Sequence, residues 1–263
     1  MSGQWQRSDT DTYTLLTLDV QDSSANVLGY AVLNELDQIL TDLESSTPAG
    51  LIIRSGKKNG FIFGADVKEF VGIESVDKAT ELAARGQGLF ARLEKLSCPT
   101  VAVIHGQCLG GGTELALACN YRVMRDDAGT RIGLPEVRLG INPGFGGTIR
   151  LPRLIGAMAA MDLMLTGRTV PGKLARRLGL ADEVVPERHL LHAAEALLHK
   201  RPRHKLALWK RLLAAPGIRT LVANTMRKQV RAKANPDQYP APYSIINLWQ
   251  RSGLFFIRCT TLP

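Results

Sequence analysis

The sequence predicts an α/β fold that is followed by a helical C-terminal region. Short runs rich in β-branched residues, such as TVAVIHG at 100–106, alternate with segments that carry apolar residues at helical spacing. From about residue 187 onward the pattern is helical and basic, and it predicts no strand. Alternation of this kind favours parallel strands joined by helices. At 263 residues, with 45% hydrophobic and 22% charged residues, the chain is long enough for one large domain with an appendage.

The N-terminal part predicts a strand–helix–strand unit. Residues 13–20, YTLLTLDV, alternate like a strand with one solvated face. Residues 29–44 carry apolar residues at helical spacing, and GLIIRS at 50–55 is a short apolar strand bounded by glycine and lysines. Together they suggest a crossover connection between parallel strands.

The middle of the chain continues the alternation. FIFGADVKEF at 61–70 predicts a strand that breaks at Gly64, and Asp66 with Glu69 three positions later can cap a new helix. Residues 77–96 predict a helix, and TVAVIHG predicts a buried strand. A run of glycines then precedes the helix ELALAC and the strand NYRVMR at 120–125.

The next segments end the predicted α/β part. TRIGLPEV at 130–137 is expected to be extended as far as Pro135, which cannot join a central ladder. INPGFGG at 141–147 predicts a glycine-rich turn, and residues 148–165 and 171–179 predict helices.

The composition limits the class of protein. The net charge of +9 comes largely from GRTVPGKLARRLG and HKRPRHKLALWKRLL, which suit either a solvated basic helical surface or an anionic small ligand. No recognition motif or aromatic stacking pattern supports nucleic-acid binding. No apolar run is long enough to span a membrane, and the N-terminus does not read as a secretory signal, so a cytoplasmic location is expected.

The four cysteines do not form a metal or redox motif. Cys98, Cys108, Cys119 and Cys259 lack CxxC spacing and have no histidines at zinc spacing. The first three lie in or beside apolar segments, and the sequence predicts buried thiols.

A glutamate beside three glycines is the first candidate for chemistry. In HGQCLGGGTELALA (105–118), Glu114 follows Gly110, Gly111 and Gly112 at the start of a predicted helix. Free backbone N–H groups at a helix N-terminus suit an anion, or an oxygen that becomes one during reaction. The alternative is structural, since a first-turn glutamate stabilises its own helix by about 0.3–1 kcal/mol.

Two further elements complete a constellation. In IGLPEVRLGINPGFGG, the turn around Gly144 follows Glu136 by eight positions and could direct backbone N–H groups at it. In FIFGAD, a strand that stops at Gly64 exposes the N–H of Ala65, a second donor for the same oxygen. PGFGG is no dinucleotide fingerprint, because the third glycine of GxGxxG would fall at Ile149.

These segments in this order resemble a known family. GFIFGADVKEF, AVIHGQCLGGGTELALACNYRV and IGLPEVRLGINPGFGGTIRLPRLIG are similar to the signature segments of the enoyl-CoA hydratase (crotonase) superfamily, and the likeness covers roughly residues 10–200. The resemblance is strongest to the hydratase half of the multifunctional bacterial fatty-acid oxidation subunits. It implies a spiral of repeated ββα units with a helical C-terminal region.

The resemblance also implies roles for individual residues. The N–H groups of Ala65 and Gly111 would hold a thioester oxygen, Glu114 would activate a water, and Glu136 would deliver a proton. Asp66, Lys68, Gly110 and Gly144 would contact the acyl-CoA substrate or the glutamates. The implied activity is hydration of 2-enoyl-CoA, with double-bond isomerisation as a second activity and without any metal or redox cofactor. His105 is predicted to be a strand-end residue only.

The implied organisation is a hydratase core at 1–190 and a helical region at 191–263. NPDQYPAPYSIINLWQ resembles the stretch that leads to a dehydrogenase half in the multifunctional proteins, so the chain is expected to be a split or shortened relative. The expected partners are acyl-CoA, further copies of the chain in a trimer or hexamer, or a thiolase subunit, with no nucleic acid. The alternative hypothesis is a truncated, non-catalytic acyl-CoA-binding or assembly domain.

Overall fold

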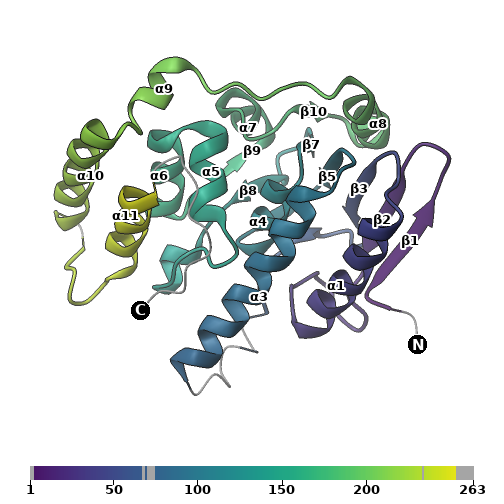
Figure 1. Ribbon diagram of the computed structural model, residues 1–263, viewed down its shortest axis with the longest axis horizontal. Helices are drawn as coiled ribbons and strands as arrows, with labels where there is room; N and C mark the ends of the chain where they lie inside the picture. The colour runs from purple at the N-terminus through teal and green to yellow at the C-terminus, as the bar shows by residue number, and fades with distance from the viewer. Residues whose placement is uncertain (1–2, 67–68, 70–74, 233, 253–263) are drawn as a thin grey trace.

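The larger of two sheets lies toward the N-terminal side of the molecule, away from the C-terminal helices (Figure 1). The computed structural model describes residues 3–66, 69, 75–232 and 234–252. The strand order is β1-β2-β3-β5-β7-β10; β1 pairs antiparallel with β2, and the others pair parallel. The strands are β1 (Trp5–Asp9), β2 (Thr14–Leu18), β3 (Leu51–Ser55), β5 (Thr100–Ile104), β7 (Tyr121–Arg125) and β10 (Glu183–Val185).

The smaller sheet is formed by every second strand from β4 to β8, together with β9. Its order is β4-β6-β8-β9, with β9 antiparallel to β8. The chain passes from β3 to β4, from β5 to β6 and from β7 to β8, so each pair contributes one strand to each sheet before a helix follows. This is the predicted spiral of ββα units. The strands are β4 (Gly60–Ile62), β6 (Gln107–Leu109), β8 (Arg131–Gly133) and β9 (Thr169–Pro171).

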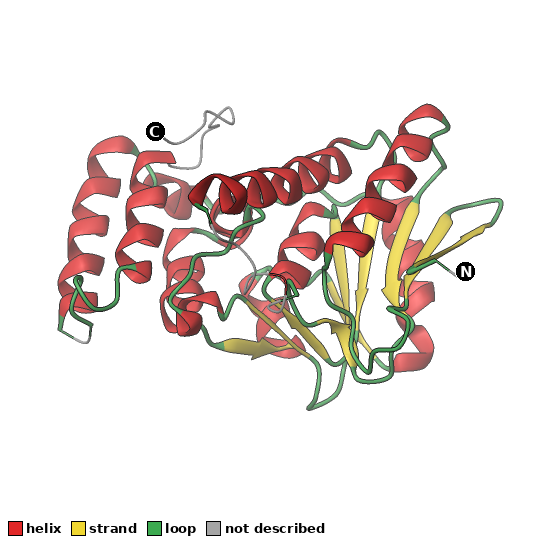
Figure 2. Cartoon of the chain, turned by 90° about the horizontal axis from the view of Figure 1, so that it is seen from below, coloured by secondary structure: helices red, strands yellow, loops and turns green. Residues whose placement is uncertain are grey.

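Helices cover both faces of the larger sheet (Figure 2). On one face Leu190, Ala194 and Leu197 of α8 pack against Val101 and Val123 of the central strands. The neighbouring residues of these strands point the other way, into the large core beneath α1, α3 and α4. The helices are α1 (Tyr30–Ser45), α3 (Val76–Lys95), α4 (Gly111–Ala118), α5 (Gly147–Ile155), α6 (Ala157–Thr166), α7 (Gly172–Leu178), α8 (Leu190–Lys200), α9 (Leu208–Leu212), α10 (Pro216–Arg231) and α11 (Ala241–Ser252), with 3-10 turns η1 (Glu136–Leu139) and η2 (Glu187–His189).

Most predicted elements are confirmed. The strand–helix–strand unit is β2–α1–β3, and β2 pairs parallel with β3 from Thr14↔Leu51 to Leu18↔Ser55. The sequence analysis missed β1, β6, β9 and β10. Three of these have only three residues, too few for a periodic pattern to register.

Two local predictions are wrong. The helix predicted at 148–165 is two helices, α5 and α6, because the backbone at Gly156 takes a φ of +90° between them. The segment predicted to be extended as far as Pro135 ends its strand at Gly133, and Glu136 begins the 3-10 turn η1. The helix start predicted at Asp66 and Glu69 lies largely outside the described residues; the Glu69 carboxylate accepts the N–H of Tyr30 at the start of α1, with N–O distances of 2.8 and 3.0 Å.

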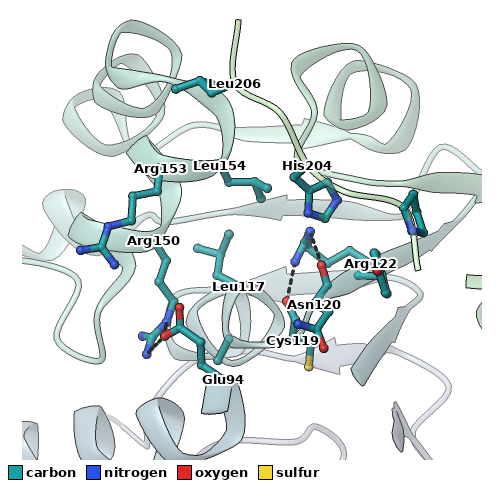
Figure 3. A pocket seen from close by; sticks show the side chains of 13 residues that line it. Glu94, Leu117, Cys119, Asn120, Arg122, Arg150, Arg153, Leu154, His204 and Leu206 are labelled. Atoms are coloured by element: carbon teal, nitrogen blue, oxygen red, sulfur yellow. Dashed lines mark hydrogen bonds and ion pairs between the residues drawn. The ribbon is translucent and has the colours of Figure 1, made fainter. Parts of the chain in front are cut away.

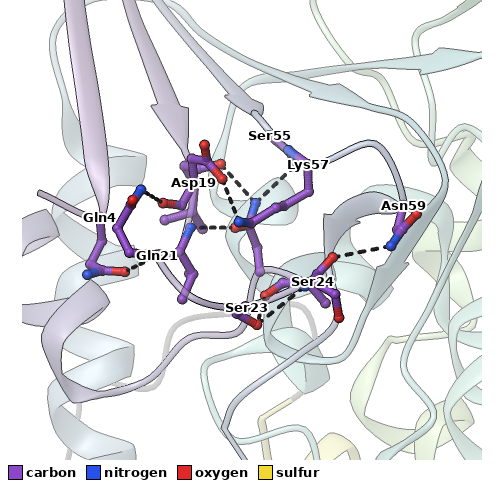
Figure 4. A network of polar contacts seen from close by, with 12 residues as sticks. Gln4, Asp19, Gln21, Ser23, Ser24, Ser55, Lys57 and Asn59 are labelled. Carbon is purple, nitrogen blue, oxygen red and sulfur yellow. Dashed lines mark hydrogen bonds and ion pairs between the residues drawn. The ribbon is translucent and has the colours of Figure 1, made fainter. Parts of the chain in front are cut away.

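A buried polar network fixes the segment that leads to Ala65. The side-chain amide of Asn26 donates to Leu18 O, Ser55 Oγ and Phe61 O, and its oxygen accepts the N–H of Val20. Beside it, Lys57 pairs with Asp19 at 2.7 Å, and Asn59 Nδ2 donates to Ser24 O (Figure 4). The ends of β2, β3 and β4 are therefore held together immediately before Gly64.

The C-terminal helices pack on the α/β part. α11 contacts α5, α6 and α10. Its Ile245, Ile246 and Trp249 belong to the same core cluster as the strands, and Trp249 is 1% exposed. The predicted division at residue 190 stays a prediction.

The cysteine and membrane predictions can be checked on the described residues. Cys98, Cys108 and Cys119 are buried free thiols, as predicted, whereas Cys259 lies outside the described residues. Over the same part of the chain, the helices are too short or too polar to cross a membrane.

Candidate active site

The glycine triplet shapes the entry to α4. Gly110 adopts φ +52°, ψ −125°, a conformation open to glycine and strained for other residues. A β-carbon on Gly112 would lie 2.5 Å from Ile62 O, so only glycine lets α4 approach β4 this closely. Glu114 follows in the first turn, where it is 2% exposed.

The Glu114 carboxylate is held by the glycine-rich turn at 144–147. Its Oε1 accepts the N–H of Phe145 at 2.8 Å and that of Gly147 at 2.7 Å. Burial raises the pKa of Glu114 to about 7, while these N–H groups and the charge of Arg150 oppose the rise. We expected this turn to serve Glu136; it binds the other glutamate.

Glu136 lies beside the glycines with an unpartnered carboxylate. It is 9% exposed, and within the described residues neither of its oxygens has a hydrogen-bond partner. A β-carbon on Gly110 would lie 3.2 Å from Glu136 Oε1, which places this carboxylate against the triplet. Burial, and then the nearby charge of Glu114, raise the pKa of Glu136 to about 8. The two carboxylates therefore share one buried environment.

Backbone donors converge next to this pair. Leu28 N donates to Gly64 O and Asp66 N donates to Leu28 O, so the parallel pairing turns the N–H of Ala65 away from Leu28. A β-carbon on Gly111 would lie 3.4 Å from Ala65 N, and one on Gly64 would lie 4.0 Å from Gly111 N. The N–H of Gly111 is one of the first-turn donors that a helix leaves without an internal partner. Both predicted donors thus lie at one place.

The remaining predicted site residues are less central. Asp66 is half-buried beside Gly29 at the start of α1. Gly144 contributes its carbonyl, which accepts Gln87 Nε2 at 2.7 Å. Lys68 lies outside the described residues. His105 contacts the carbonyl of Lys57 with Nε2 at 2.6 Å, consistent with a strand-end role.

A separate pocket of about 320 Å³ lies beyond the C-terminal end of α4, between α5 and the segment at 202–206 (Figure 3). Its arginines already have partners. Arg122 donates to the carbonyls of Ala116, Cys119, Asn120 and Leu180, and Arg150 pairs with Glu94. Neither glutamate of the candidate site lines this pocket.

The sequence model of the enoyl-CoA hydratase/isomerase family matches residues 12–235. The chain belongs to this family. It is 43% identical over 250 residues to the fatty acid oxidation complex subunit alpha of Vibrio cholerae, covering 92% of this chain and 35% of the relative. The corresponding subunit of Shewanella amazonensis is 44% identical over 243 residues, covering 90% and 34%. The chain thus spans about a third of the length of these relatives.

Solved structures of the enoyl-CoA hydratase/isomerase family share the fold. An enoyl-CoA hydratase from Bacillus anthracis is 34% identical, with a TM-score of 0.68 over 75% of this chain and 76% of that one. A Geobacillus kaustophilus protein of 24% identity gives a TM-score of 0.70 over 97% and 93%, a likeness in fold alone. These matches confirm the predicted α/β crotonase fold.

Phe145, Gly147 and Gln87 were not singled out by the sequence analysis. The glycine-rich turn was the only feature that pointed to Phe145 and Gly147. The sequence does not reveal which carboxylate this turn binds. Gln87 stands within a helix of ordinary pattern, and its contact with Gly144 spans 57 positions.

Proposed function

We propose that the chain is an enoyl-CoA hydratase that adds water across the 2,3 double bond of a trans-2-enoyl-CoA thioester in fatty-acid β-oxidation. The observation that carries this proposal is a pair of buried carboxylates with raised pKa values beside two converging backbone N–H donors. Family membership and the β-oxidation names of the relatives support the same chemistry.

The N–H groups of Ala65 and Gly111 would bind the thioester oxygen. As hydroxide adds to C3, the electrons of the double bond move to C2 and the carbonyl oxygen gains negative charge. Two fixed donors stabilise that charge, and removing one donor of this kind typically costs about 3–4 kcal/mol of transition-state stabilisation.

Glu114 and Glu136 would divide the two proton transfers. Glu114 takes a proton from the attacking water, and Glu136 gives one to C2. Burial raises both pKa values, and the charge of Glu114 raises that of Glu136 further, so the two neighbouring carboxylates do not ionise independently and can hold one proton between them near neutral pH. Return of the proton from Glu114 to Glu136 through solvent restores the starting state.

Two proton-transferring carboxylates also support Δ3–Δ2 isomerisation as a second activity. That reaction needs removal of a proton from C2 and delivery of one to C4, with the same enolate oxygen held by the same donors. The family description, hydratase/isomerase, covers both reactions.

Further parts of the proposal concern partners and location. The relatives' name, a subunit of a complex, supports assembly with other chains, for which a thiolase subunit or further copies of this chain are our candidates. Catalysis without a metal or redox cofactor and a cytoplasmic location belong to the same proposal.

The test is hydration of crotonyl-CoA, followed as loss of the conjugated-thioester absorbance. We expect activity in the parent, and a loss of roughly 10²–10⁴-fold in kcat for Glu114→Gln and for Glu136→Gln, the range that positioned acid–base groups supply. A folded parent that binds acyl-CoA without turning it over would establish the alternative, a non-catalytic binding domain. The analogous 3-enoyl-CoA assay decides the isomerase activity.

A further inference from the structure

Helix α3 contacts the turn that holds Glu114. Gln87, half-buried on α3, donates from Nε2 to the carbonyl of Gly144 at 2.7 Å. The next residue along the turn, Phe145, and then Gly147 give their N–H groups to Glu114 Oε1. One side-chain hydrogen bond of α3 therefore lies directly behind the donors of the carboxylate.

Close packing reinforces this hydrogen bond. A β-carbon on Gly86 would lie 2.4 Å from the ring of Phe145, so the missing side chain is what lets α3 lie on this ring. Phe90, one turn further along α3, meets the Phe145 ring edge-on, with centroids 5.5 Å apart. Two positions after Gly86, Gly88 is exposed, and a β-carbon there would have no atom within 4 Å.

A third contact joins α3 to the turn through the carbonyl of Phe145. Arg150 of α5 donates from Nη1 to Phe145 O at 2.9 Å, and its guanidinium pairs with Glu94 near the end of α3 at 2.9 Å. Figure 3 shows Arg150 and Glu94 side by side at the edge of the pocket. The turn is thus held through its backbone and its aromatic ring by one helix.

We propose that Gln87 and Gly86 are positioning residues: they hold the turn at 144–147 so that its N–H groups occupy one oxygen of Glu114 and leave Oε2 for the reaction. The proposal rests on the proposed function for the identity of the reaction. The structural claim, that α3 positions the Glu114 carboxylate, can be tested without measuring turnover.

The direction of the effect follows from hydrogen bonding to the charged form. N–H donors favour the ionised carboxylate and oppose the effect of burial on Glu114. Loosening the turn weakens these donors, so the Glu114 pKa rises further and the base is lost at a higher pH. A rise of half to one pKa unit lowers the ionised fraction well below that pKa by about threefold to tenfold.

The experiment compares Gln87→Met, which keeps the side chain's length without its donor, with Gly86→Ala and the matched control Gly88→Ala. The readout is the titration of Glu114 by NMR in protein carrying glutamate labelled with ¹³C at the side-chain carboxyl carbon, with the resonance assigned by its loss in Glu114→Gln. We expect the Glu114 pKa to rise in Gln87→Met and Gly86→Ala and to stay at the parent value in Gly88→Ala. The acid limb of kcat for crotonyl-CoA should move by the same amount, with KM little changed.

Two results would overturn the proposal. One is an unshifted Glu114 titration in both Gln87→Met and Gly86→Ala, whatever happens to kcat. The other is an equal shift in Gly88→Ala, which would indicate a general effect of altering α3. If the parent itself lacks hydratase activity, the proposed function fails while the titration still decides the positioning claim. Should Gly86→Ala not fold, Gln87→Met carries the test alone, since it introduces no clash.

Discussion

At the scale of single residues, the Glu136 carboxylate is the most unusual group in the described part of the chain. It is buried without a protein hydrogen-bond partner beside a second buried carboxylate. Keeping such a group ionised costs folding free energy. The same burial raises its pKa, which makes it a proton donor near neutral pH. Glu136 should therefore destabilise the fold, whatever it contributes to the proposed reaction.

The sign of this effect can be worked out from the raised pKa. Between the unfolded value near 4.5 and the folded value of about 8, the native state binds more protons at this position than the unfolded state. Stability must then fall as pH rises through this window, and below it the position contributes no such penalty.

We expect Glu136→Gln to raise the melting temperature relative to the parent at pH 8–9, with a gain that shrinks toward pH 5. Each kcal/mol of relieved cost corresponds to about 2–4 °C in a chain of this size. Thermal unfolding by circular dichroism at several pH values measures it, with Glu81→Gln, whose side chain is 69% exposed, as the control. A gain independent of pH, or a loss at pH 9, would contradict the assignment of a raised pKa.

The sequence predicted the residue types of the site better than their contacts. Glu114, Glu136 and the glycines stand out because a carboxylate and backbone freedom are costly near a core. The partner of Glu114 did not stand out, because Phe145 N and Gly147 N lie 31 and 33 positions away and donate through the backbone, which leaves no side-chain signature.

At the scale of elements, two helices use glycine in opposite ways. In α4, position 112 requires glycine, because a β-carbon there would lie 2.5 Å from Ile62 O. In α3, Gly88 is exposed with no neighbour within 4 Å of that position, so it weakens the helix without a packing reason. The same substitution should therefore have opposite effects on stability.

We expect Gly112→Ala to lower the free energy of unfolding by about 1–3 kcal/mol, as overpacking does, and to reduce activity by displacing Glu114. Gly88→Ala should raise that free energy by about 0.4–1 kcal/mol, because alanine restricts the unfolded chain at a position whose helical conformation it adopts readily. Urea unfolding of both variants provides the comparison. Similar losses in the two helices would show that the contact with β4 is not what selects glycine at position 112.

Helices and strands with a clear hydrophobic period were predicted from the sequence. Short strands that depend on pairing with neighbouring strands were not. α1, α3 and the central strands follow their hydrophobic spacing. β6 and β9 exist because neighbouring strands of the smaller sheet offer them a ladder, and a three-residue strand carries no period of its own. The sequence likewise did not predict the turn from β8 into η1, which directs the Glu136 side chain inward.

At the scale of the whole molecule, the C-terminal helices reach the site by way of the Glu136 loop. Tyr239 donates its hydroxyl to Val137 O, and Asn142 Nδ2 donates to Ser244 Oγ of α11 at 2.8 Å. While α3 holds the turn behind Glu114, residues after 235 thus hold the loop that follows Glu136. The two carboxylates are supported by different parts of the chain, so their alignment depends on how firmly those parts are joined.

The packing of α11 indicates that they are joined as one cooperative unit. Trp249 is 1% exposed within the main core cluster, whereas Trp209 of α9 is 58% exposed. Truncating a large buried aromatic side chain costs about 3–5 kcal/mol, and a surface change costs about 0.5 kcal/mol or less. We expect Trp249→Ala to lower the melting temperature of the entire chain, and Trp209→Ala to leave it nearly unchanged.

The shape of the transition tests the division between a core at 1–190 and a helical region at 191–263. A single core predicts one unfolding transition, with tryptophan fluorescence and far-ultraviolet circular dichroism coincident in the parent. It also predicts that Trp249→Ala lowers kcat at temperatures below its transition, because α11 then holds the loop at 137–142 less firmly. Two separate transitions, with full activity retained after the first, would instead make the C-terminal helices an independent domain and leave Glu136 supported by the α/β part alone.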